Sequence, residues 1–340
     1  MFLRALASLA LASTTFAHAA PACGQPLAAA SAPQSDVRSW LLRIHDAAGR
    51  RNFQGTFVVS GGGSVASARI SHFCEGPNQY ERIESLDGKQ RKVYRYNDVV
   101  HTVWPASHIA MIEQRGMLSS FPALLQAGDD GIGEWYEVRA EGSDRVAGHD
   151  ADVLAVRARD PLRYGYRLWA DHASGLLLRA EVLGEKGDVL ETSAFSEVSI
   201  GVRPQPETVV QAMKKLDGYR VVRPLLTPTR LESEGWTMRQ VAPGFRQVSC
   251  VSRQIDPLGE TSSAAASPPV VQSIYSDGLT YVSVFIEPFR PERHTRPMIA
   301  AVGATSTLAQ RRGDWWVTVV GDTPPATLRM FAAALERRKP

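Results

Sequence analysis

The sequence predicts an α+β protein, with an N-terminal antiparallel, unclosed half-barrel over helices and a smaller C-terminal α+β domain. Three observations lead to this prediction. Short alternating segments separated by turn residues recur along the chain, which is typical of an antiparallel meander. A strongly amphipathic segment precedes them and has the spacing of a helix. The chain has 340 residues, more than one small core usually takes, so two domains are expected.

The first expected element is the helix that fills the half-barrel. Ser35 and Asp36 are residue types that cap helix N-termini. The residues that then share one helical face are Val37, Trp40, Leu41, Ile44 and Ala48. A curved sheet packed against this apolar face makes an α+β domain.

Strands are expected from residue 54 onward. Asp87 and Gly88, placed between alternating apolar residues, form one of the stronger hairpin signals. The expected strands of the first domain cover residues 54–59, 65–73, 79–86, 90–96, 99–104, 134–141, 151–159, 164–171, 176–184 and 189–200. A briefly helical pattern interrupts them at residues 117–126.

Residues 159–179 are the most informative stretch of the chain. They predict two strands joined by a tight turn at residues 171–175, with Gly175 free to adopt a positive φ. Alternation places Tyr166 and Leu168 on one face and Arg167 and Trp169 on the other. Aromatic and arginine side chains on a sheet surface are the composition of a binding face.

Composition divides the chain into four parts. Residues 1–20 are expected to be a signal peptide, residues 35–200 the large domain, residues 201–234 a proline-rich linker with a short helix at 207–216, and residues 235–340 the small domain. The small domain is expected to hold strands at 247–255, 270–275, 279–287, 299–308 and 315–320, and a final helix that begins at Pro325 and ends at Arg338.

The N-terminus predicts export. Arg4, a short apolar run and a small-residue site around Ala19 have the form of a secretory signal. Cys23 has Ala20 three residues before it and not leucine, which favours simple cleavage over lipid attachment. Removing Arg4 lowers the formal charge from +3 to +2, too small to indicate a nucleic-acid partner.

The three cysteines leave the redox question open. An exported chain can form a disulfide, but only one pair can form among Cys23, Cys74 and Cys250. The sequence does not select that pair. Their wide spacing also differs from that of a zinc site.

Patterns of catalysis are missing from the sequence, so we expect no enzyme, no metal and no cofactor. The glycine run at residues 61–63 lacks the lysine of a phosphate loop and fits a hairpin tip. The histidines are scattered without metal-ligand spacing. No Gly-x-Ser-x-Gly turn presents a serine nucleophile.

Arginines and one apolar connection are the candidate binding residues. Arginine pairs with carboxylates and phosphates and stacks on aromatic rings, although ordinary solvated strand faces explain each arginine equally simply. Residues 103–121 are unusually apolar for a connection, as in loops that cover a ligand or partner site. The candidates for ligand or partner binding are Arg82, Arg91, Arg95, Trp104, Met111, Met117, Arg163 and Arg167.

A curved sheet around a helix also leaves room for an apolar pocket, although a filled core is the simpler interpretation. The side chains that would line such a pocket are Phe57, Val59, Ile70, Tyr80, Ile83, Tyr94, Val103, Tyr166, Leu168 and Leu178.

Eight segments of the chain, in order, resemble the MucB/RseB family. They are residues 54–58, 81–88, 145–148, 163–169, 243–245, 275–279, 282–287 and 319–325. Each alone is a weak strand-and-turn pattern, whereas eight in the same order are specific. The resemblance covers roughly residues 36–336, although Cys74 and Cys250 match no family role.

The resemblance implies a periplasmic negative regulator of the envelope-stress sigma factor. Such proteins bind the periplasmic domain of a MucA/RseA-type anti-sigma factor, shield it from the site-1 protease, and release it when lipid or lipopolysaccharide binds. The family's large domain looks like the lipoprotein carriers LolA and LolB, its small domain helps to hold the anti-sigma factor, and its members self-associate. The alternative is a periplasmic lipid or lipoprotein carrier, against which the second domain argues. A hydrolase is a third class and would need a converging nucleophile and base.

Overall fold

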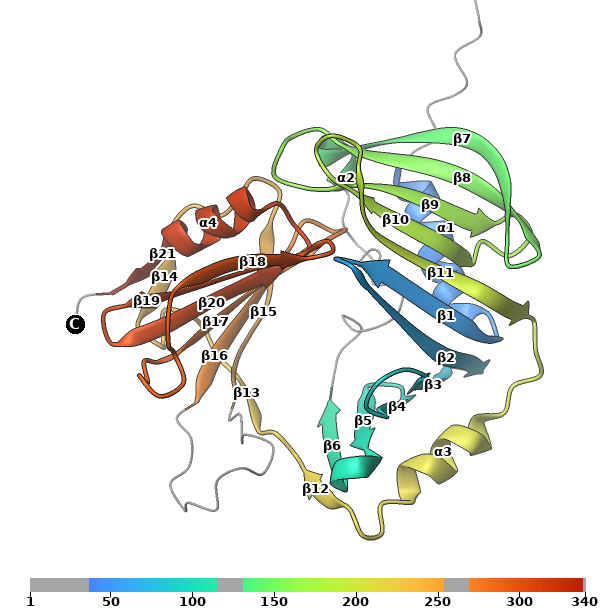
Figure 1. The fold of residues 1–340 in the computed structure, drawn as a ribbon, viewed down its shortest axis with the longest axis horizontal. Coiled ribbons are helices and arrows are strands. Elements are labelled where there is room, and N and C mark those ends of the chain that lie inside the picture. Colours follow the sequence, from blue (N-terminus) through green and yellow to red (C-terminus); the bar gives the residue numbers. More distant parts are fainter. Residues whose placement is uncertain (1–36, 115–130, 254–268, 339–340) are drawn as a thin grey trace, which may run out of the picture. The chain divides into compact units, whose positions relative to one another are not determined.

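A twelve-stranded sheet and a seven-stranded sheet account for most of the protein in the computed structural model (Figure 1). The structure describes residues 37–114, 131–253 and 269–338, and residues Gln34–Pro340 form one compact unit. The expected signal peptide, Cys23, Met117 and the helical pattern at 117–126 lie outside the described residues.

The large sheet has the strand order β12-β6-β5-β4-β3-β2-β1-β11-β10-β9-β8-β7. Its strands are β1 (Phe53–Gly61), β2 (Ser64–Glu75), β3 (Asn78–Ser85), β4 (Lys92–Tyr96), β5 (Val99–Trp104), β6 (Ile109–Gln114), β7 (Tyr136–Val146), β8 (His149–Ala158), β9 (Gly165–Asp171), β10 (Leu177–Leu183), β11 (Val189–Ile200) and β12 (Arg220–Val222). β12 and β7 stand at opposite ends of this order, so the sheet is open. The prediction of an unclosed, largely antiparallel meander is confirmed.

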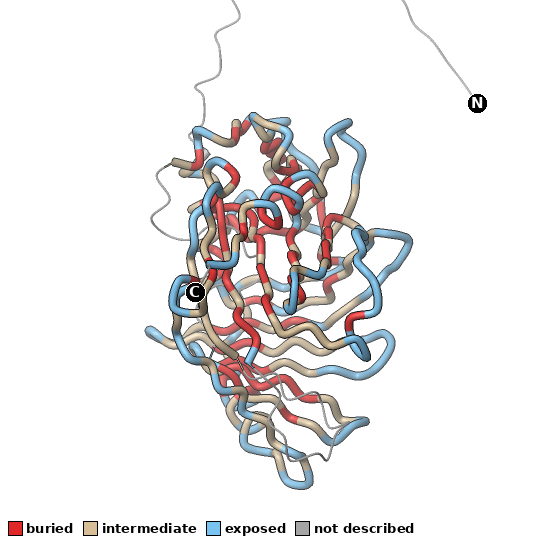
Figure 2. The backbone as a smooth tube through the Cα atoms, turned by 90° about the vertical axis from the view of Figure 1, so that its left-hand side faces the viewer, coloured by how far each residue is buried: buried red, intermediate tan, exposed pale blue. Residues whose placement is uncertain are grey.

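Helix α1 (Val37–Arg50) packs against one face of this sheet, here called the inner face. Leu41 and Ile44 are fully buried together with Tyr166 and Leu168 from β9. The expected helix and the alternation in residues 164–171 are therefore confirmed. In Figure 2 the buried residues gather in the interior of the molecule, and the outermost turns of the tube are mostly exposed.

The opposite, outer face is covered in part by helix α3 (Pro206–Lys214). Val209 is fully buried against Phe73 and Tyr80. The expected linker thus carries a helix, the edge strand β12, and β13 (Leu226–Pro228), which pairs with the second sheet. The prolines of this segment indicated a linker, but the apolar residues between them pack on the sheet.

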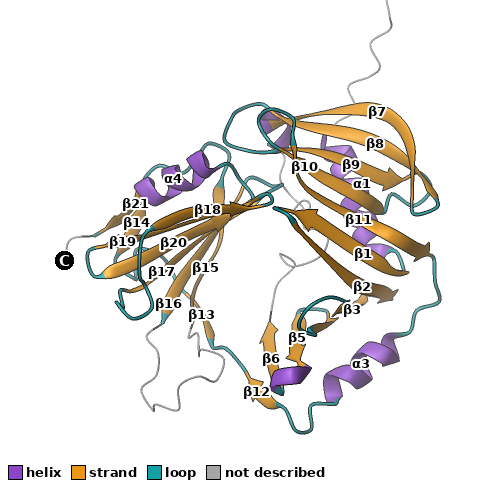
Figure 3. Cartoon of the chain, in the orientation of Figure 1, coloured by secondary structure: helices purple, strands orange, loops and turns teal. Residues whose placement is uncertain are grey.

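The second sheet has the order β13-β15-β16-β17-β20-β19-β18 and is antiparallel throughout (Figure 3). Its further strands are β15 (Arg246–Arg253), β16 (Val270–Ser276), β17 (Tyr281–Pro288), β18 (Met298–Val302), β19 (Thr305–Arg312) and β20 (Trp315–Gly321). Helix α4 (Pro325–Ala334) packs on β19 and β20, and β14 (Trp236–Met238) pairs with β21 (Leu335–Arg337).

Four local predictions were wrong. Residues 109–114 form strand β6, paired with β5, inside the stretch 103–121 that was expected to be a connection. Residues 299–308 form a hairpin and not one strand, because Gly303 has a φ of 58° and reverses the chain. The last helix ends at Ala334, where residues 335–337 pair with β14. A one-turn helix, α2 (Ile132–Trp135), precedes β7 where a strand was expected from residue 134.

Cys74 and Cys250 both carry free thiols. Burial raises the pKa of each thiol, which keeps both protonated and weakly reactive near neutral pH. None of the helices within the described residues is long and apolar enough to cross a membrane.

Candidate ligand and partner surfaces

One row of side chains crosses the inner face of the large sheet from β1 to β6. Strand register pairs Phe53 with His72, His72 with Glu81, Glu81 with Arg95, Arg95 with Val100 and Val100 with Glu113. Side chains paired in this way project from the same face. An aromatic ring, an imidazole, two carboxylates and a guanidinium therefore share a row beside α1.

The charged members of this row are buried. Arg95 is 5 % exposed and Glu113 is 6 % exposed. An Arg95 nitrogen lies 4.0 Å from a Glu81 carboxylate oxygen, and Arg95 Nε donates to the Asn97 carbonyl at 2.7 Å. From the second sheet, an Arg253 nitrogen lies 3.6 Å from a Glu113 carboxylate oxygen. The row therefore joins the inner face to strand β15.

Glu81 is the group in this row with the most altered acidity. Burial raises the pKa of Glu81 to about 7, and Arg95 offsets only part of that effect. His72 is affected in the opposite direction, since burial lowers the pKa of its imidazole. The inner face consequently holds a carboxyl group that takes up a proton near neutral pH.

Replacing Glu81 with glutamine is expected to change how stability depends on pH. Between the unfolded pKa of 4.5 and the folded pKa of about 7, the folded protein keeps a proton that the unfolded chain has lost. The stability that Glu81 contributes is therefore complete below pH 4.5 and falls as pH rises through about 7. From about pH 5 to pH 8, the wild type should lose stability relative to Glu81→Gln in urea unfolding. His72 is present in both proteins, so its contribution cancels in the difference between them. If the two stability profiles run parallel from about pH 5 to pH 8, the raised pKa of Glu81 is wrong.

Three of the predicted binding residues lie on or beside this inner face. Arg95 is in the buried row, and the same alternation places Trp104 and Met111 on that face, both half-buried. Ile83 and Val93 lie between them and are also half-buried. The inner face of β3–β6 is thus a partly accessible apolar surface next to buried charges, a composition that suits an acyl chain or an apolar peptide segment. Met117 lies outside the described residues.

Arg82 and Arg91 are placed differently. Arg82 projects from the outer face and donates to a Glu84 carboxylate oxygen at 2.8 Å, and Lys92 lies 3.3 Å from the same oxygen. Arg91 is exposed in the turn before β4. Tyr80, Tyr94 and Val103, which were expected to line an apolar pocket, also face outward and pack against α3. The predicted arginines therefore do not all lie on the same face of the sheet.

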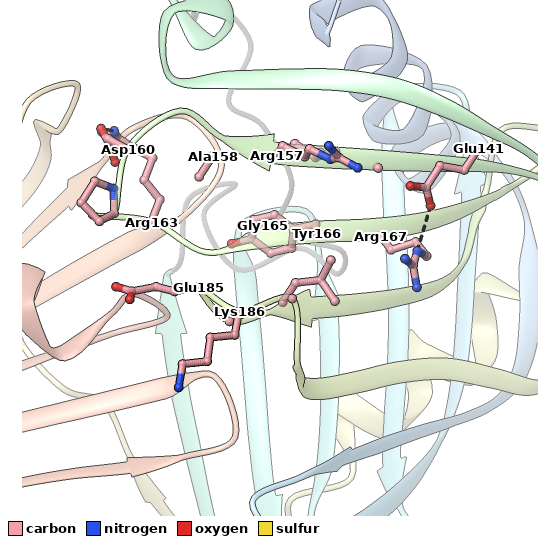
Figure 4. Close-up of a pocket in the computed structure, with 16 residues that line it drawn as sticks. Glu141, Arg157, Ala158, Asp160, Arg163, Gly165, Tyr166, Arg167, Glu185 and Lys186 are labelled. Atoms are coloured by element: carbon pink, nitrogen blue, oxygen red, sulfur yellow. Dashed lines mark hydrogen bonds and ion pairs between the residues drawn. The ribbon is translucent and has the colours of Figure 1, made fainter.

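Arg167 lies on the outer face beside a pocket of about 570 Å³ formed by β7–β10 and the turn at residues 184–187 (Figure 4). Arg167 Nε donates to Glu141 at 2.9 Å, and a second nitrogen lies 3.4 Å from Glu181. Arg157 and Lys186 also line this pocket, as does Glu185. Basic and acidic groups are mixed here, so the pocket has no strong preference for one sign of charge.

Arg163 lies where the two sheets meet. Its side chain and that of Asp277 are both fully buried, and Arg163 Nε donates to an Asp277 oxygen at 2.8 Å. Its other nitrogens donate to Asp160 and to the Pro243 carbonyl. The guanidinium also packs against the ring of Trp135, 4.7 Å from its centroid. In this structure Arg163 holds the two domains together and is closed to a ligand.

Asp277 is a connecting residue that sequence reasoning missed, because it entered the sequence analysis only within the resemblance segment 275–279. One of its oxygens accepts the N–H groups of Leu279 and Thr280, which shapes that turn. Its other oxygen accepts from Arg163 and from the Tyr136 hydroxyl at 2.9 Å. Leu279 enters the same buried cluster as α1. A buried aspartate with four donors is a structural connector.

The described residues contain no group of three or more His, Cys, Asp or Glu side chains that could hold a metal ion. The Ser174 hydroxyl donates to Asp171 at 2.6 Å, within a turn. His172 contacts Asp152 at 2.8 Å on the surface, where the carboxylate raises the pKa of the imidazole. What the surfaces offer is binding: an apolar inner face, exposed basic groups and a second sheet fixed to the first.

Comparison with known proteins gives the family. The MucB/RseB N-terminal domain model matches residues 36–213, and the MucB/RseB C-terminal domain model matches residues 230–336. The sigma factor AlgU regulatory protein MucB of Pseudomonas aeruginosa is 29 % identical over 324 residues, covering 92 % of this chain and 94 % of MucB. The sigma-E factor regulatory protein RseB of Escherichia coli is 24 % identical over 312 residues, covering 91 % and 93 %.

Solved structures agree with this result. The crystal structure of MucB in complex with MucA(peri) matches with a TM-score of 0.64 and 29 % identity, covering 90 % of this chain and 100 % of that one. A crystal structure of MucB alone matches with the same TM-score and 27 % identity. The eight sequence segments, both family models and the fold lead to one assignment: the chain belongs to the MucB/RseB family.

Proposed function

We propose that this protein is a periplasmic negative regulator of an envelope-stress sigma factor. In this role it binds the periplasmic domain of a MucA/RseA-type anti-sigma factor and shields it from the site-1 protease. The observation that carries the proposal is the match of both domains, in order, to regulators of sigma factors, together with similarity to MucB in complex with MucA(peri). Its action is binding, not catalysis.

The arrangement of charges and apolar surface supports two kinds of occupant. A peptide partner offers carboxylates to exposed arginines and apolar side chains to the inner face. A lipid or lipopolysaccharide offers acyl chains to the same apolar face and phosphates to basic groups near it. Trp104 and Met111 are the inner-face contacts we propose, with Arg91 at its rim. Arg82 and Arg167 are proposed as outer-face contacts.

Lipid is proposed to release the anti-sigma factor. Release requires only that the two ligands compete or that they favour different states of the protein. The buried row of Glu81, Arg95 and Glu113 lies beside the proposed lipid surface and continues to Arg253 in the second sheet. Acyl chains that enter the inner face would therefore disturb contacts between the domains. Self-association of the protein is also part of the proposal.

A titration of the purified anti-sigma periplasmic domain into the protein tests this function. We expect binding by calorimetry, and an acyl lipid or lipopolysaccharide should weaken it by about 5–150-fold, the range of a coupling of about 1–3 kcal/mol. The lipid vehicle alone is the control. If the anti-sigma domain does not bind the protein even when no lipid is present, the proposed regulatory function is wrong.

The alternative function is a lipid or lipoprotein carrier, favoured by the half-buried apolar side chains on the inner face of β3–β6. A carrier would retain acyl lipid in native mass spectra, pass it to an acceptor, and ignore the anti-sigma domain. The buried links between the two domains argue against this alternative, since a shuttle has no need of a fixed second module.

A further inference from the structure

Strand β18 (Met298–Val302) forms one end of the second sheet and is exposed along its whole length (Figure 1). Met298 is 48 % exposed, Ile299 42 % and Val302 63 %. All five residues, Met-Ile-Ala-Ala-Val, are uncharged and apolar. A bare apolar edge offers unpaired backbone groups to another strand, and proteins usually protect such edges.

The other sheet ends in the described part of the chain are protected. β7 is long but carries the exposed charges Arg139, Glu141 and Arg145, and a bulge between Ala140 and Gly142. β12, β13, β14 and β21 have three residues each, and β13 ends in Pro228. Charges, bulges, short strands and proline are the usual protections. β18 has none of them within its five residues.

The backbone geometry of the hairpin identifies the groups that the edge offers. A two-residue turn joins Val302 to Thr305, so this flanking pair exchanges its backbone hydrogen bonds. Antiparallel pairs then alternate, and Val302, Ala300 and Met298 bond to β19. The N–H and C=O groups of Ile299 and Ala301 consequently point to the free edge.

A basic loop leads directly into this strand. Arg290, Arg293 and Arg296 lie within the eight residues before Met298, against the single acid Glu292. Arg293 and Arg296 are exposed and Arg290 is half-buried. In the part of the chain that the structure describes, none of the three guanidiniums pairs with a carboxylate. The loop therefore places unneutralised positive charge at the start of the bare edge.

These two features favour an acidic peptide over a second copy of this chain. Two β18 strands paired about a two-fold axis would bring together uncharged residues over only five positions, far less area than the roughly 1,200–2,000 Å² of a stable interface. Such a pair would also leave the arginines without partners. A single added strand is an established way to bind a short peptide, with backbone bonds for affinity and side chains for specificity.

We propose that the free edge of β18 binds an extended segment of the protein's partner as an added antiparallel strand. The segment has apolar residues at alternate positions and then acidic residues, which lie beside Arg290, Arg293 and Arg296. This inference rests on the proposed function, because the anti-sigma periplasmic domain is the partner that the test uses.

Two variants of the full chain test the proposal by calorimetry. Ala301→Pro removes an outward N–H without removing a bond to β19, and should weaken binding about tenfold or more. Ala301→Thr keeps the N–H and should bind as the wild type does. Replacing Arg290, Arg293 and Arg296 with glutamate should weaken binding to a similar degree and lessen its dependence on salt. The charge-matched control replaces the exposed Arg203, Lys214 and Lys215, none of which is a proposed contact, with glutamate.

Hydrogen exchange provides a readout that does not depend on the variants. On binding, the amides of Ile299 and Ala301 should become protected, whereas Ala300 should change little because β19 already protects it. If the wild type binds the partner but hydrogen exchange in β18 is unchanged and the variants bind normally, the added-strand proposal is wrong while the proposed regulatory function stands. Absence of wild-type binding would overturn both. If, without any partner, the β18 amides become more protected as the protein concentration rises, the edge pairs with a second copy of the chain and the proposal is wrong.

Discussion

Replacing Arg163 with methionine is expected to lower the free energy of unfolding by about 3–5 kcal/mol. The substitution would leave the Asp277 carboxylate fully buried without its cationic partner. It would also free the Pro243 carbonyl and remove the cation from the rings of Trp135 and Phe245. A buried charge without compensation is much more costly than a lost surface contact.

Urea unfolding followed by tryptophan fluorescence measures this effect. Arg167→Met is the matched control, since Arg167 is 39 % exposed and its ion pairs should contribute less than about 1 kcal/mol. Adding Asp277→Asn to Arg163→Met should recover part of the loss because the unpaired charge is gone. If Arg163→Met unfolds within about 1 kcal/mol of the wild type, the pair does not hold the domains together.

The sequence predicted the large domain well wherever the determining pattern was local. Alternation in residues 164–171 correctly put Tyr166 and Leu168 on the buried side, because side chains in a strand alternate between the two faces. The helix near residue 37 followed from its apolar spacing in the same way. These features depend only on neighbours a few positions apart.

Features that depend on distant residues were not predicted. Arg163 and Asp277 are 114 positions apart, so nothing near Arg163 indicated that it would be buried between the domains. Glu113 and Arg253 meet from different sheets in the same way. In contrast, the placement of Arg82 and Arg95 on opposite faces follows from the strand pattern. Glu81 pairs with Arg95 across adjacent strands and shares its face, so Arg82, the next residue after Glu81, projects from the other face.

Turn chemistry explains the error in the second sheet. Residues 299–308 looked like one apolar strand, and Gly303 within it was passed over. An isolated glycine inside a strand pattern is a signal for a break. The end of α4 had no such local signal, because it depends on β14 and on Arg312, which donates to the carbonyls of Ala332 and Leu335.

Shielding of the anti-sigma factor should be the largest functional effect. A partner whose cleavage site is covered when bound is cut only in its free form. With the protein at about 100 times its dissociation constant, about 1 % of the partner remains free, so cleavage should slow by up to about 100-fold. The physical basis is occupancy of the cleavage region, and no catalytic residue of this chain is required.

The rate at which the site-1 protease cuts the purified anti-sigma periplasmic domain, with and without this protein, tests that shielding most directly. An unrelated peptide substrate of the same protease is the control for direct inhibition. We predict slow cleavage that becomes faster, toward the uninhibited rate, when acyl lipid or lipopolysaccharide is added. Cleavage at the same rate with and without saturating protein would contradict the proposed function.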